Sequence, residues 1–535
     1  MKLIVRQVEV PLEYGKTDII EGLVKKLRCR NEDIKGHEVV RRSLDARPRR
    51  PAPVFILQVE VEVSDQLKKN LPHSQDIEML KQIPVEEKVP QFIIPEHRPI
   101  VVGAGPAGLM AAFHLAMLGL KPIVIERGVK AEDRREVVDE FWRSGRFMQE
   151  NNVLYGEGGA GLFSDGKLTA RSKDRPRIRL FFETLVQCGA PPEIMIDSEP
   201  HLGSDILLEI VPRMRQIIEK RGGEFRFKMR LEHILFDGNL VNSVVASGEK
   251  FKTRHVILAT GHSARDIYQL LAEAGVALEA KPFAVGVRLE VPQKQIDQSQ
   301  YGEFAGHPQL KAASFKLTRK PENVARACYS FCMCPGGLVI ACASEAGMLT
   351  TNGMSYSARS GQMGNAAFIV PVNPEDFSDP TSPYPVLAGL KMQQKIETAA
   401  FNAGGGNFTV PAARLSDFLN DRISQDLPGN RSCRLAKPAD FNGILPEYIM
   451  QTLKSAIPPM LKELNQVNTD DALLYAAETR SSSPVRVLRD ENGCSASHKG
   501  LFPAGEGAGY AGGIVSSAVD GLRAAEMLVE SLEKP

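Results

Sequence analysis

The chain has 535 residues, which is long enough for three or four domains of about 150 residues each. Hydrophobic residues make up 43% of it and charged residues 24%, and the net charge of +1 gives no general attraction to nucleic acid or to an anionic membrane. No stretch approaches about 18 uninterrupted apolar residues, and the first residues lack the apolar core of a signal peptide, so we expect neither a membrane span nor export. The eight cysteines show no CxxC spacing, which indicates reduced thiols, a cytoplasmic location and no metal site.

Residues 1–92 are predicted to form a small α+β module. Strands are expected at 3–10, 39–44 and 54–63, and the apolar residues of 19–27 recur at helical spacing. Between two of the strands lies RRSLDARPRR, which contains Arg41, Arg42, Arg47, Arg49 and Arg50. This run is either a contact for RNA or an acidic partner, or a solvated turn, and its short length favours the turn.

A polar linker at about 85–97 leads to VVGAGPAGLMAAFHLAMLGLKPIVIERG, residues 101–128. An apolar strand runs into Gly103-x-Gly105-x-x-Gly108, a helix follows, and a second strand ends at Glu126. In this pattern the first glycine permits the tight turn, the second admits a pyrophosphate, and the third lets the helix pack on the strand. The helix N-terminus offers unpaired N–H groups to phosphate, and Glu126 is placed to accept hydrogen bonds from a ribose.

We expect the first part of this cofactor domain to span 93–276. Short strands at 225–252 predict a β-meander, and the apolar strand 255–261 returns the chain to a parallel sheet.

Residues 277–470 differ in composition from the cofactor domain. They contain many predicted turns with Gly, Pro, Asn and Ser, and predicted strands such as 284–291 and 338–343. They are predicted to form an inserted substrate domain, after which the cofactor domain resumes at 471–535. In this last part a second cluster of glycines, residues 505–513, precedes a long terminal helix that begins near Ile514. A glycine-rich turn before a helix N-terminus is again suited to bind an anion or a dipole.

Together the two clusters resemble the glutathione-reductase-type FAD fold. Nearly the whole chain is also similar to the uncharacterised FAD-dependent dehydrogenases of bacteria and plastids, in strings such as GEGGAGLFSDGKL, ETRSSSPVR and PAGEGAGYAGGIVSSAVDGLRAAE. This resemblance implies FAD as the cofactor, with its pyrophosphate on the first turn, its ribityl chain and flavin on the second, and residues 155–168 beside the flavin. Glu506 stands where this superfamily usually has aspartate. The residues implied in FAD binding are Gly103, Gly105, Pro106, Ala107, Gly108, Glu126, Arg127, Gly158, Gly159, Ala160, Lys167, Thr260, Gly261, Gly505, Glu506, Gly512, Gly513 and Ile514.

Two motifs found in related flavoenzymes are missing from this sequence, and their absence limits the reactions that we expect. Residues 150–170 contain no cysteine, although disulfide-reducing relatives carry CxxxxC there, so that chemistry is disfavoured. No second strand–GxGxxG–helix unit is complete, which disfavours a separate NAD(P)H domain. The electron donor is then a pyridine nucleotide at a shared face, the substrate itself, or a protein.

Four of the cysteines lie close together in the sequence of the inserted domain. Cys328, Cys332 and Cys334 have even spacing and would share one face of a strand, and Cys342 follows in a neighbouring strand. They are a redox pair, a metal site or small buried hydrophobic residues. Because no histidine accompanies them, we favour buried residues, with Cys334 kept as a weak substrate candidate.

Two arginines, Arg480 and Arg486, flank SSSP and suit a carboxylate or phosphate substrate, or they pair with acids such as Glu478. Arg288 is a lesser candidate of the same kind. His262, which follows the turn Ala259-Thr260-Gly261 (the ATG turn), is either a proton donor or a packed side chain.

The sequence therefore predicts an α/β protein whose Rossmann-like FAD-binding domain is split by an inserted α+β substrate domain and preceded by a small α+β module. The predicted function is an FAD-dependent oxidoreductase, a dehydrogenase or reductase that passes hydride through flavin N5 to or from a small molecule. Two alternatives stay open: a flavoprotein that modifies or binds RNA through its N-terminal module, and a non-catalytic binding protein stabilised by FAD.

Overall fold

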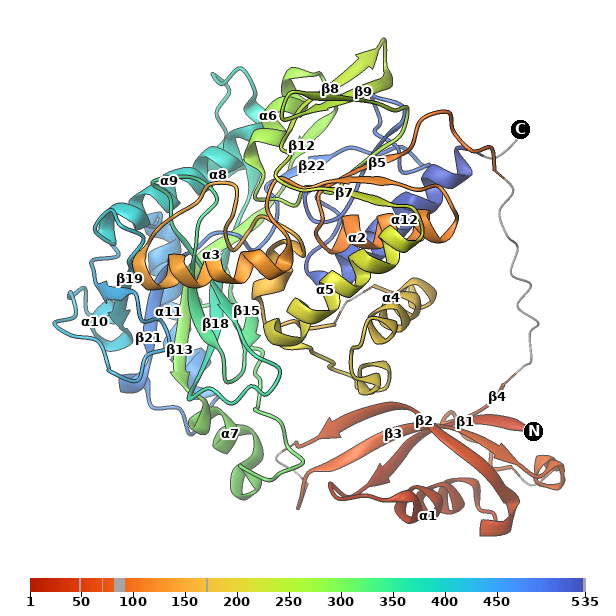
Figure 1. Ribbon diagram of the computed structural model, residues 1–535. Coiled ribbons are helices and arrows are strands. Elements are labelled where there is room, and N and C mark those ends of the chain that lie inside the picture. Colours follow the sequence, from red (N-terminus) through yellow and green to blue (C-terminus); the bar gives the residue numbers. More distant parts are fainter. Residues whose placement is uncertain (48–49, 70, 81–91, 170–171, 533–535) are drawn as a thin grey trace.

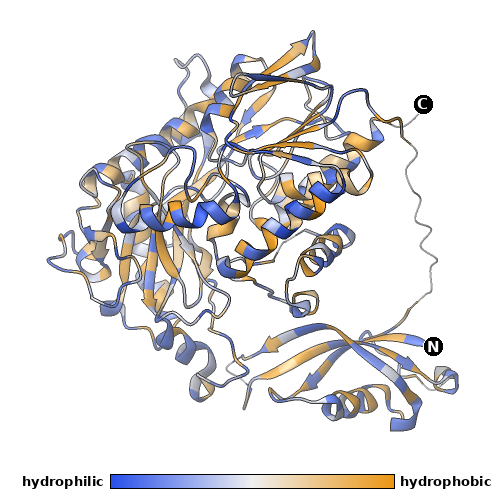
Figure 2. Ribbon diagram, viewed as in Figure 1, coloured by the Kyte–Doolittle hydropathy of each residue, from blue (hydrophilic) through white to orange (hydrophobic). Residues whose placement is uncertain are grey.

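The computed structural model describes residues 1–47, 50–69, 71–80, 92–169 and 172–532. Figure 1 shows a small N-terminal module set beside two larger domains, one built on a parallel sheet and one on a mostly antiparallel sheet. Hydrophobic residues follow the strands inside both large domains, whereas α3 (Ala131–Ser144) is largely hydrophilic (Figure 2). This α/β architecture confirms the predicted fold class.

The N-terminal module is a four-stranded antiparallel sheet in the order β2-β3-β1-β4. Its elements are β1 (Lys2–Val10), α1 (Lys16–Leu27), β2 (Ile34–Asp45), β3 (Val54–Val63) and β4 (Ile77–Met79). Alternate residues of β3 are buried against α1, as the sequence pattern predicts.

The arginine-rich run on this module is largely engaged within the chain. Arg42 donates to Asp197 at 2.9 Å and so joins the module to the rest of the protein. Arg47 and Arg50 both pair with Asp45, the last residue of β2. Arg49 lies outside the described residues. The first half of the run, through Asp45, lies in β2, and only the residues after it fit the predicted turn.

The cofactor domain contains a five-stranded parallel sheet in the order β23-β11-β5-β6-β7. Its strands are β5 (Ile100–Val102), β6 (Ile123–Ile125), β7 (Glu224–Arg226), β11 (Val256–Leu258) and β23 (Leu501–Pro503). Its helices, besides α3, are α2 (Pro106–Met117), α4 (Arg175–Gln187), α5 (Gly203–Lys220), α6 (Arg265–Glu273) and α12 (Ile514–Glu530). The predicted meander is β8 (Leu231–Asp237), β9 (Leu240–Ala246) and β10 (Glu249–Lys252).

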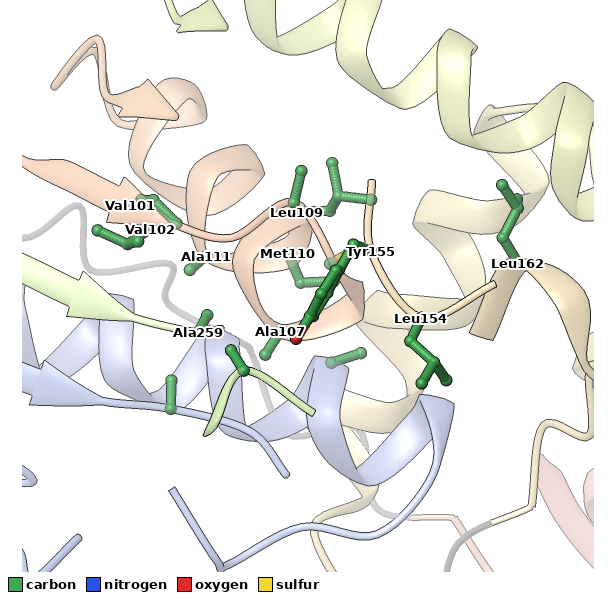
Figure 3. Packing of buried hydrophobic residues seen from close by; sticks show 14 of the residues in the cluster. Val101, Val102, Ala107, Leu109, Met110, Ala111, Leu154, Tyr155, Leu162 and Ala259 are labelled. Atoms are coloured by element: carbon green, nitrogen blue, oxygen red, sulfur yellow. The ribbon is translucent and has the colours of Figure 1, made fainter. Parts of the chain in front are cut away.

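Helices α2 and α12 pack closely although they begin about 400 residues apart in the chain. The contact depends on Gly521, because a Cβ there would lie 2.0 Å from the carbonyl oxygen of Ala107. Figure 3 shows the buried residues around α2, which include Val101, Met110 and Ala259. The two helix N-termini therefore reach the same edge of the sheet.

The inserted domain is built on a seven-stranded sheet in the order β14-β15-β18-β13-β21-β19-β20. Its strands are β13 (Phe283–Pro292), β14 (Thr318–Arg319), β15 (Cys328–Cys334), β18 (Met363–Val372), β19 (Val410–Arg414), β20 (Ala436–Pro438) and β21 (Leu473–Glu478). The helices are α7 (Gln293–Tyr301), α8 (Pro374–Phe377), α9 (Ala388–Ala403), α10 (Leu415–Leu419) and α11 (Glu447–Lys462). The predicted boundary at residue 470 precedes β21, which lies within this sheet.

Two small two-stranded sheets complete the fold. They pair β16 (Leu338–Cys342) with β17 (Thr350–Met354), and β12 (Leu278–Ala280) with β22 (Val485–Val487). The strand that carries Cys342 is thus paired with β17 and not with the cysteine-rich strand β15. Within the described ranges, no helix combines the length and apolar character needed to cross a membrane.

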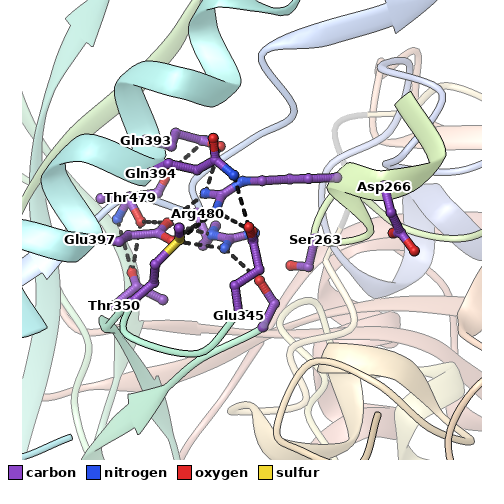
Figure 4. Close-up of polar contacts among 12 residues, drawn as sticks. Ser263, Asp266, Glu345, Thr350, Gln393, Gln394, Glu397, Thr479 and Arg480 are labelled. Atoms are coloured by element: carbon purple, nitrogen blue, oxygen red, sulfur yellow. Dashed lines mark hydrogen bonds and ion pairs between the residues drawn. The ribbon is translucent and has the colours of Figure 1, made fainter. Parts of the chain in front are cut away.

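A buried carboxylate joins the cofactor domain to the inserted domain (Figure 4). Glu397 of α9 accepts hydrogen bonds from Arg265 of α6 at 2.8 and 3.0 Å and from Arg480 at 2.7 and 3.0 Å. Only 1% of Glu397 is exposed. Burial opposes its charge, but Arg480 and Arg265 outweigh that effect and lower the pKa of Glu397 to about 2.

Replacement of Glu397 by glutamine should leave the buried Arg480 without a counter-charge and Arg265 with Glu345 alone, and should destabilise the protein by about 3 kcal/mol. The loss should appear as a lower urea midpoint at pH 7. Because the pKa of Glu397 is depressed in the folded state, its stabilising effect should be present above about pH 4.5 and decline toward pH 2. Glu345→Gln, at a more exposed partner of Arg265, is the matched control, and equal shifts for the two variants would contradict the assignment.

Candidate functional site

The first glycine turn has the geometry that its spacing predicts. Gly103 adopts φ +101, and a Cβ there would lie 2.4 Å from the carbonyl oxygen of Ala259. A Cβ at Gly108 would lie 1.8 Å from the carbonyl oxygen of Gly103, so both positions need glycine for packing. Gly105 differs, because its nearest neighbour in the Cβ direction is 3.8 Å away. It precedes Pro106, the first residue of α2, and leaves room for a ligand to approach the helix N-terminus.

Glu126 binds three backbone amides where β6 ends. Its Oε2 accepts from the amide of Ala104 at 2.8 Å, and its Oε1 accepts from Gly128 at 2.9 Å and Gly156 at 3.0 Å. A carboxylate has about four lone-pair positions, so one remains for a ribose hydroxyl. Arg127 next to it is engaged with Glu150 and Asp266 and stacks on the ring of Tyr155 at 4.2 Å.

The loop predicted to pass the flavin is held by a residue that the sequence did not single out. Arg134 of α3 is fully buried and donates to the carbonyl oxygens of residues 152, 153, 156, 157 and 159. Burial lowers its pKa to about 10 against the opposing effects of Glu126 and Glu157. Gly158 and Gly159 follow with φ +84 and +61, and the amide of Gly158 donates to Ala104 at 2.8 Å. The loop, with Ala160 half-buried in it, therefore lies against the first glycine turn.

The second glycine turn reaches the same place. The missing Cβ of Gly505 would be 2.7 Å from the Cβ of Ala107, and its amide donates to Asp520 at 2.7 Å. Asp520 in turn accepts from Arg489 at 2.6 and 2.9 Å. Gly512 and Gly513 face open space in the direction of a Cβ, and Gly513 precedes the first turn of α12. Asp520 is a further residue that local sequence patterns did not indicate.

Ile514 connects this turn to the flavin loop, because its Cγ1 would be 3.2 Å from a Cβ at Gly161. Together, the two helix N-termini and the loop form the surroundings of one site.

The ATG turn closes another side of this site. A Cβ at Gly261, which follows Thr260, would face open space, while Gly507 packs on the carbonyl group of Gly261. His262 lies 3.7 Å from Glu506, measured from Nε2 to Oε1. Burial and the charges of Arg480, Arg265 and Lys281 lower the pKa of His262 to about 3, so it is neutral and unprotonated at physiological pH. Burial raises the pKa of Glu506 to about 7.

Lys167 is the partly exposed cation of the flavin loop. Its Nζ lies 3.9 Å from Asp165, which is buried and accepts hydrogen bonds from Ser355 and Arg359. Because Ser355 follows β17, this contact places the inserted domain directly against the flavin loop.

The substrate candidates lie in the interior of the inserted domain or at its edge. Arg288 is fully buried and donates to Glu478 at 2.8 and 3.0 Å and to Asn365 at 2.9 Å. Arg480 is bound by Glu397, although its Nη1 is buried and has no partner among the described groups. Arg486 pairs with Glu279 at 3.0 Å. The structure does not bring these arginines to one common acceptor.

Cys334 and Cys342 are fully buried, whereas Cys332 is partly exposed. In the described ranges, no group of three or more His, Cys, Asp and Glu side chains is arranged to hold a metal ion.

Three family models match the chain. Residues 97–279 match pyridine nucleotide-disulphide oxidoreductase, residues 282–481 match FAD-dependent protein, C-terminal domain-like, and residues 1–62 match a domain of unknown function. A relative from Clostridium beijerinckii, described as an uncharacterized protein, is 41% identical over 541 residues and is aligned over 100% of both chains.

Solved structures with low identity are also similar. The halogenase PltM in complex with phloroglucinol and FAD has 11% identity, covering 81% of this chain and 68% of that one, with a TM-score of 0.37. The amino acid oxidase NikD has 13% identity, covering 81% and 94%, with a TM-score of 0.36.

The fold and the paired glycine turns define an FAD-binding flavoprotein. Two family models match adjoining parts of the chain, and one relative matches its full length. The chain therefore belongs to a family of FAD-dependent oxidoreductases, and FAD is its cofactor.

Replacement of Gly105 by valine should abolish FAD retention without loss of the fold, because the new side chain would enter the space where the pyrophosphate approaches. We expect at least about a tenfold loss of affinity, equal to 1.4 kcal/mol or more. Bound flavin is measured by its visible absorption and the fold by circular dichroism. Gly36→Val is the control, because its side chain would project into open space from β2 in the N-terminal module. A full complement of flavin in Gly105→Val would contradict the assignment.

Replacement of Glu506 by glutamine should change how stability depends on pH. The pKa of Glu506 is raised in the folded state, so the wild-type protein should lose stability relative to the variant as the pH rises from about 4.5 through about 7. The side chain is 23% exposed, so we expect a change of about 2 kcal/mol, less than the full shift implies. Thermal unfolding of the FAD-free proteins at pH 5 and pH 8 measures it. The same trend in Glu273→Gln, at an exposed position of α6, would contradict the prediction.

Proposed function

We propose that this FAD-dependent oxidoreductase passes hydride through flavin N5 to or from a small-molecule substrate bound between its cofactor and inserted domains. The observation that carries the proposal is the convergence of two helix N-termini, α2 and α12. A Cβ at Gly513 would face open space, and a Cβ at Gly105 would meet only the Cα of Gly159, at 3.8 Å. Unpaired helix amides and open glycines are what a pyrophosphate and an electron-rich flavin edge require.

Each part of FAD has a proposed binding segment. The α2 turn with Gly103, Gly105, Pro106, Ala107 and Gly108 holds the pyrophosphate, and Glu126 accepts from the adenosine ribose. The ribityl chain and flavin lie against three further segments, which contain Gly158, Gly159, Ala160 and Lys167; Thr260 and Gly261; and Gly505, Glu506, Gly512, Gly513 and Ile514. Bound FAD supplies the two-electron chemistry, and the protein orients the substrate.

Charges around the site support the flavin assignment. Lys167 places a cation beside the flavin loop, where it favours a reduced, anionic flavin. His262 is unprotonated because burial and three neighbouring cations disfavour its charged form, so Glu506, with a pKa of about 7, is the better local proton carrier. The electron donor we favour is a pyridine nucleotide at the shared face. The location we propose is the cytoplasm, where free thiols outside a catalytic pair stay reduced.

The proposal predicts that the bound flavin is catalytically accessible. Under anaerobic conditions, NADH, NADPH or a small organic acid should bleach the visible flavin absorption of the purified protein. After photoreduction, a screen of oxidants should find one that restores the absorption faster than buffer alone. Gly105→Val, which lacks bound flavin, controls for the photochemistry of free FAD. A bound flavin that no donor reduces and no oxidant restores would indicate a non-catalytic flavoprotein instead.

A further inference from the structure

The cysteines of β15 depart from the regular strand that their spacing predicts. The ladder between β15 and β18 changes register between Phe331 and Cys334, which marks a bulge. Within the bulge, Cys332 adopts φ +43, in the left-handed region that residues with a side chain rarely occupy. Such conformations persist only where the surroundings impose them, and they concentrate at functional sites.

The bulge brings the buried thiol of Cys334 against the backbone of Cys332. In an extended strand, Cα atoms two residues apart are separated by about 6.6 Å, close to the upper limit of about 6.8 Å for a disulfide. The left-handed residue breaks that extended path. The Sγ of Cys334 donates to the carbonyl oxygen of Cys332 at 3.4 Å, and the Nη1 of Arg288 donates to the same oxygen at 3.3 Å. Cys334 is fully buried, whereas Cys332 is partly exposed.

This pair lies one strand away from the flavin loop. A Cβ at Gly353 of β17 would be 2.8 Å from the Sγ of Cys334, so β17 covers the buried thiol. Two residues further, the amide of Ser355 donates to the carbonyl oxygen of Ser164 at 3.4 Å, and its hydroxyl binds Asp165. Both acceptors belong to the loop that we place beside the flavin. The contacts therefore run without a gap from the cysteines to the cofactor site.

The charges at the pair favour one thiolate and one thiol. The side-chain interaction with Cys334 and the charges of Lys167 and Arg288 lower the pKa of Cys332 against the opposing effects of burial and Asp165. The same interaction, burial and the charge of Asp165 raise the pKa of Cys334. The charge of Cys332 also contributes to the raised pKa of Glu506. Cys332 is thus within electrostatic reach of both segments that face the flavin, the Lys167 loop and the second glycine turn.

We propose that Cys332 and Cys334 are a redox-active dithiol that exchanges two electrons with the flavin, and that a small-molecule disulfide or dithiol is its partner outside the protein. This inference rests on the proposed function, since it needs a redox-active flavin at the site. When the Cys332 thiolate and the Cys334 thiol form an S–S bond, they would release two electrons and one proton, which bound FAD, a two-electron acceptor, would take up. In the reverse direction the disulfide accepts the same two electrons and one proton.

Exchange with the outside partner follows ordinary thiol–disulfide chemistry. The Cys332 thiolate attacks one sulfur of the small disulfide, an S–S bond to Cys332 forms, and one thiolate leaves. Cys334 then attacks Cys332 and displaces the second thiolate. The small disulfide is reduced to two thiols, one proton is taken from solvent, and the Cys332–Cys334 disulfide is ready for reduction by the flavin.

Reductive titration of the oxidised holoenzyme with dithionite under anaerobic conditions counts its electron acceptors. The wild-type protein should take up four electrons per FAD, two for the flavin and two for the disulfide. Cys332→Ser and Cys334→Ser should each take up two, whereas Cys342→Ser, at a buried thiol outside the pair, should take up four. Uptake of two electrons by the wild-type protein, or the same uptake in all variants, overturns the dithiol and leaves the flavoenzyme intact. A protein that binds no FAD at all overturns the proposed function itself.

Alkylation by iodoacetamide tests the thiols without use of the flavin. At pH 7, Cys332 should react faster than Cys29, another partly exposed thiol, and Lys167→Met should shift the pH midpoint of the Cys332 reaction upward. After oxidation, peptide mapping should find Cys332 linked to Cys334. A Cys332 that reacts no faster than Cys29 and forms no such link overturns the proposal even where the serine variants fail to fold.

Discussion

The cofactor site depends on one buried carboxylate that gathers backbone amides from three different turns. Glu126 accepts from Ala104 in the first glycine turn, from Gly128 after β6, and from Gly156 at the start of the flavin loop. Each hydrogen bond to a charged acceptor is worth about 1.5–3 kcal/mol, so these bonds offset the desolvation of the carboxylate and fix the turns relative to one another. The acceptor that we propose for a ribose hydroxyl is therefore fixed in position before a ligand arrives.

A buried cation, Arg134, holds the carbonyl oxygens of the same loop whose amide Glu126 holds. Glu126 takes the amide of Gly156, and Arg134 donates to the carbonyl oxygens of Gly156 and Glu157, so two opposite charges hold both polar groups of the same backbone. Neither charge is paired directly with the other. Each is compensated by backbone dipoles, which adds to the packing of the buried loop side chains Val153, Leu162 and Phe163. Gly159 can therefore lie against the first turn, where a Cβ at this position would be 3.2 Å from the Cα of Gly105.

The sequence predicted the parts of this site that are encoded locally and missed those that depend on long-range contacts. The spacing of Gly103, Gly105 and Gly108 implies their separate roles, because strand, turn and helix are adjacent in the chain. Other residues have no such local signal: Arg134 acts on a loop that begins 18 residues later, and Glu397 lies 83 residues before Arg480. Glu478, the nearby acid considered for Arg480, is taken instead by Arg288 of the neighbouring strand β13.

The cysteines show why an alternating pattern is a weaker guide at the edge of a site. Even spacing places side chains on one face only while a strand stays regular, and no glycine marks the bulge at Cys332. The left-handed conformation there costs about 1–3 kcal/mol and must be imposed by its neighbours. Arg288 supplies one constraint by binding the carbonyl oxygen of Cys332, and it can be buried at that point because Glu478 and Asn365 satisfy its charge. Arg288, which the sequence suggested as a substrate ligand, is fully buried and holds the backbone of Cys332 in place.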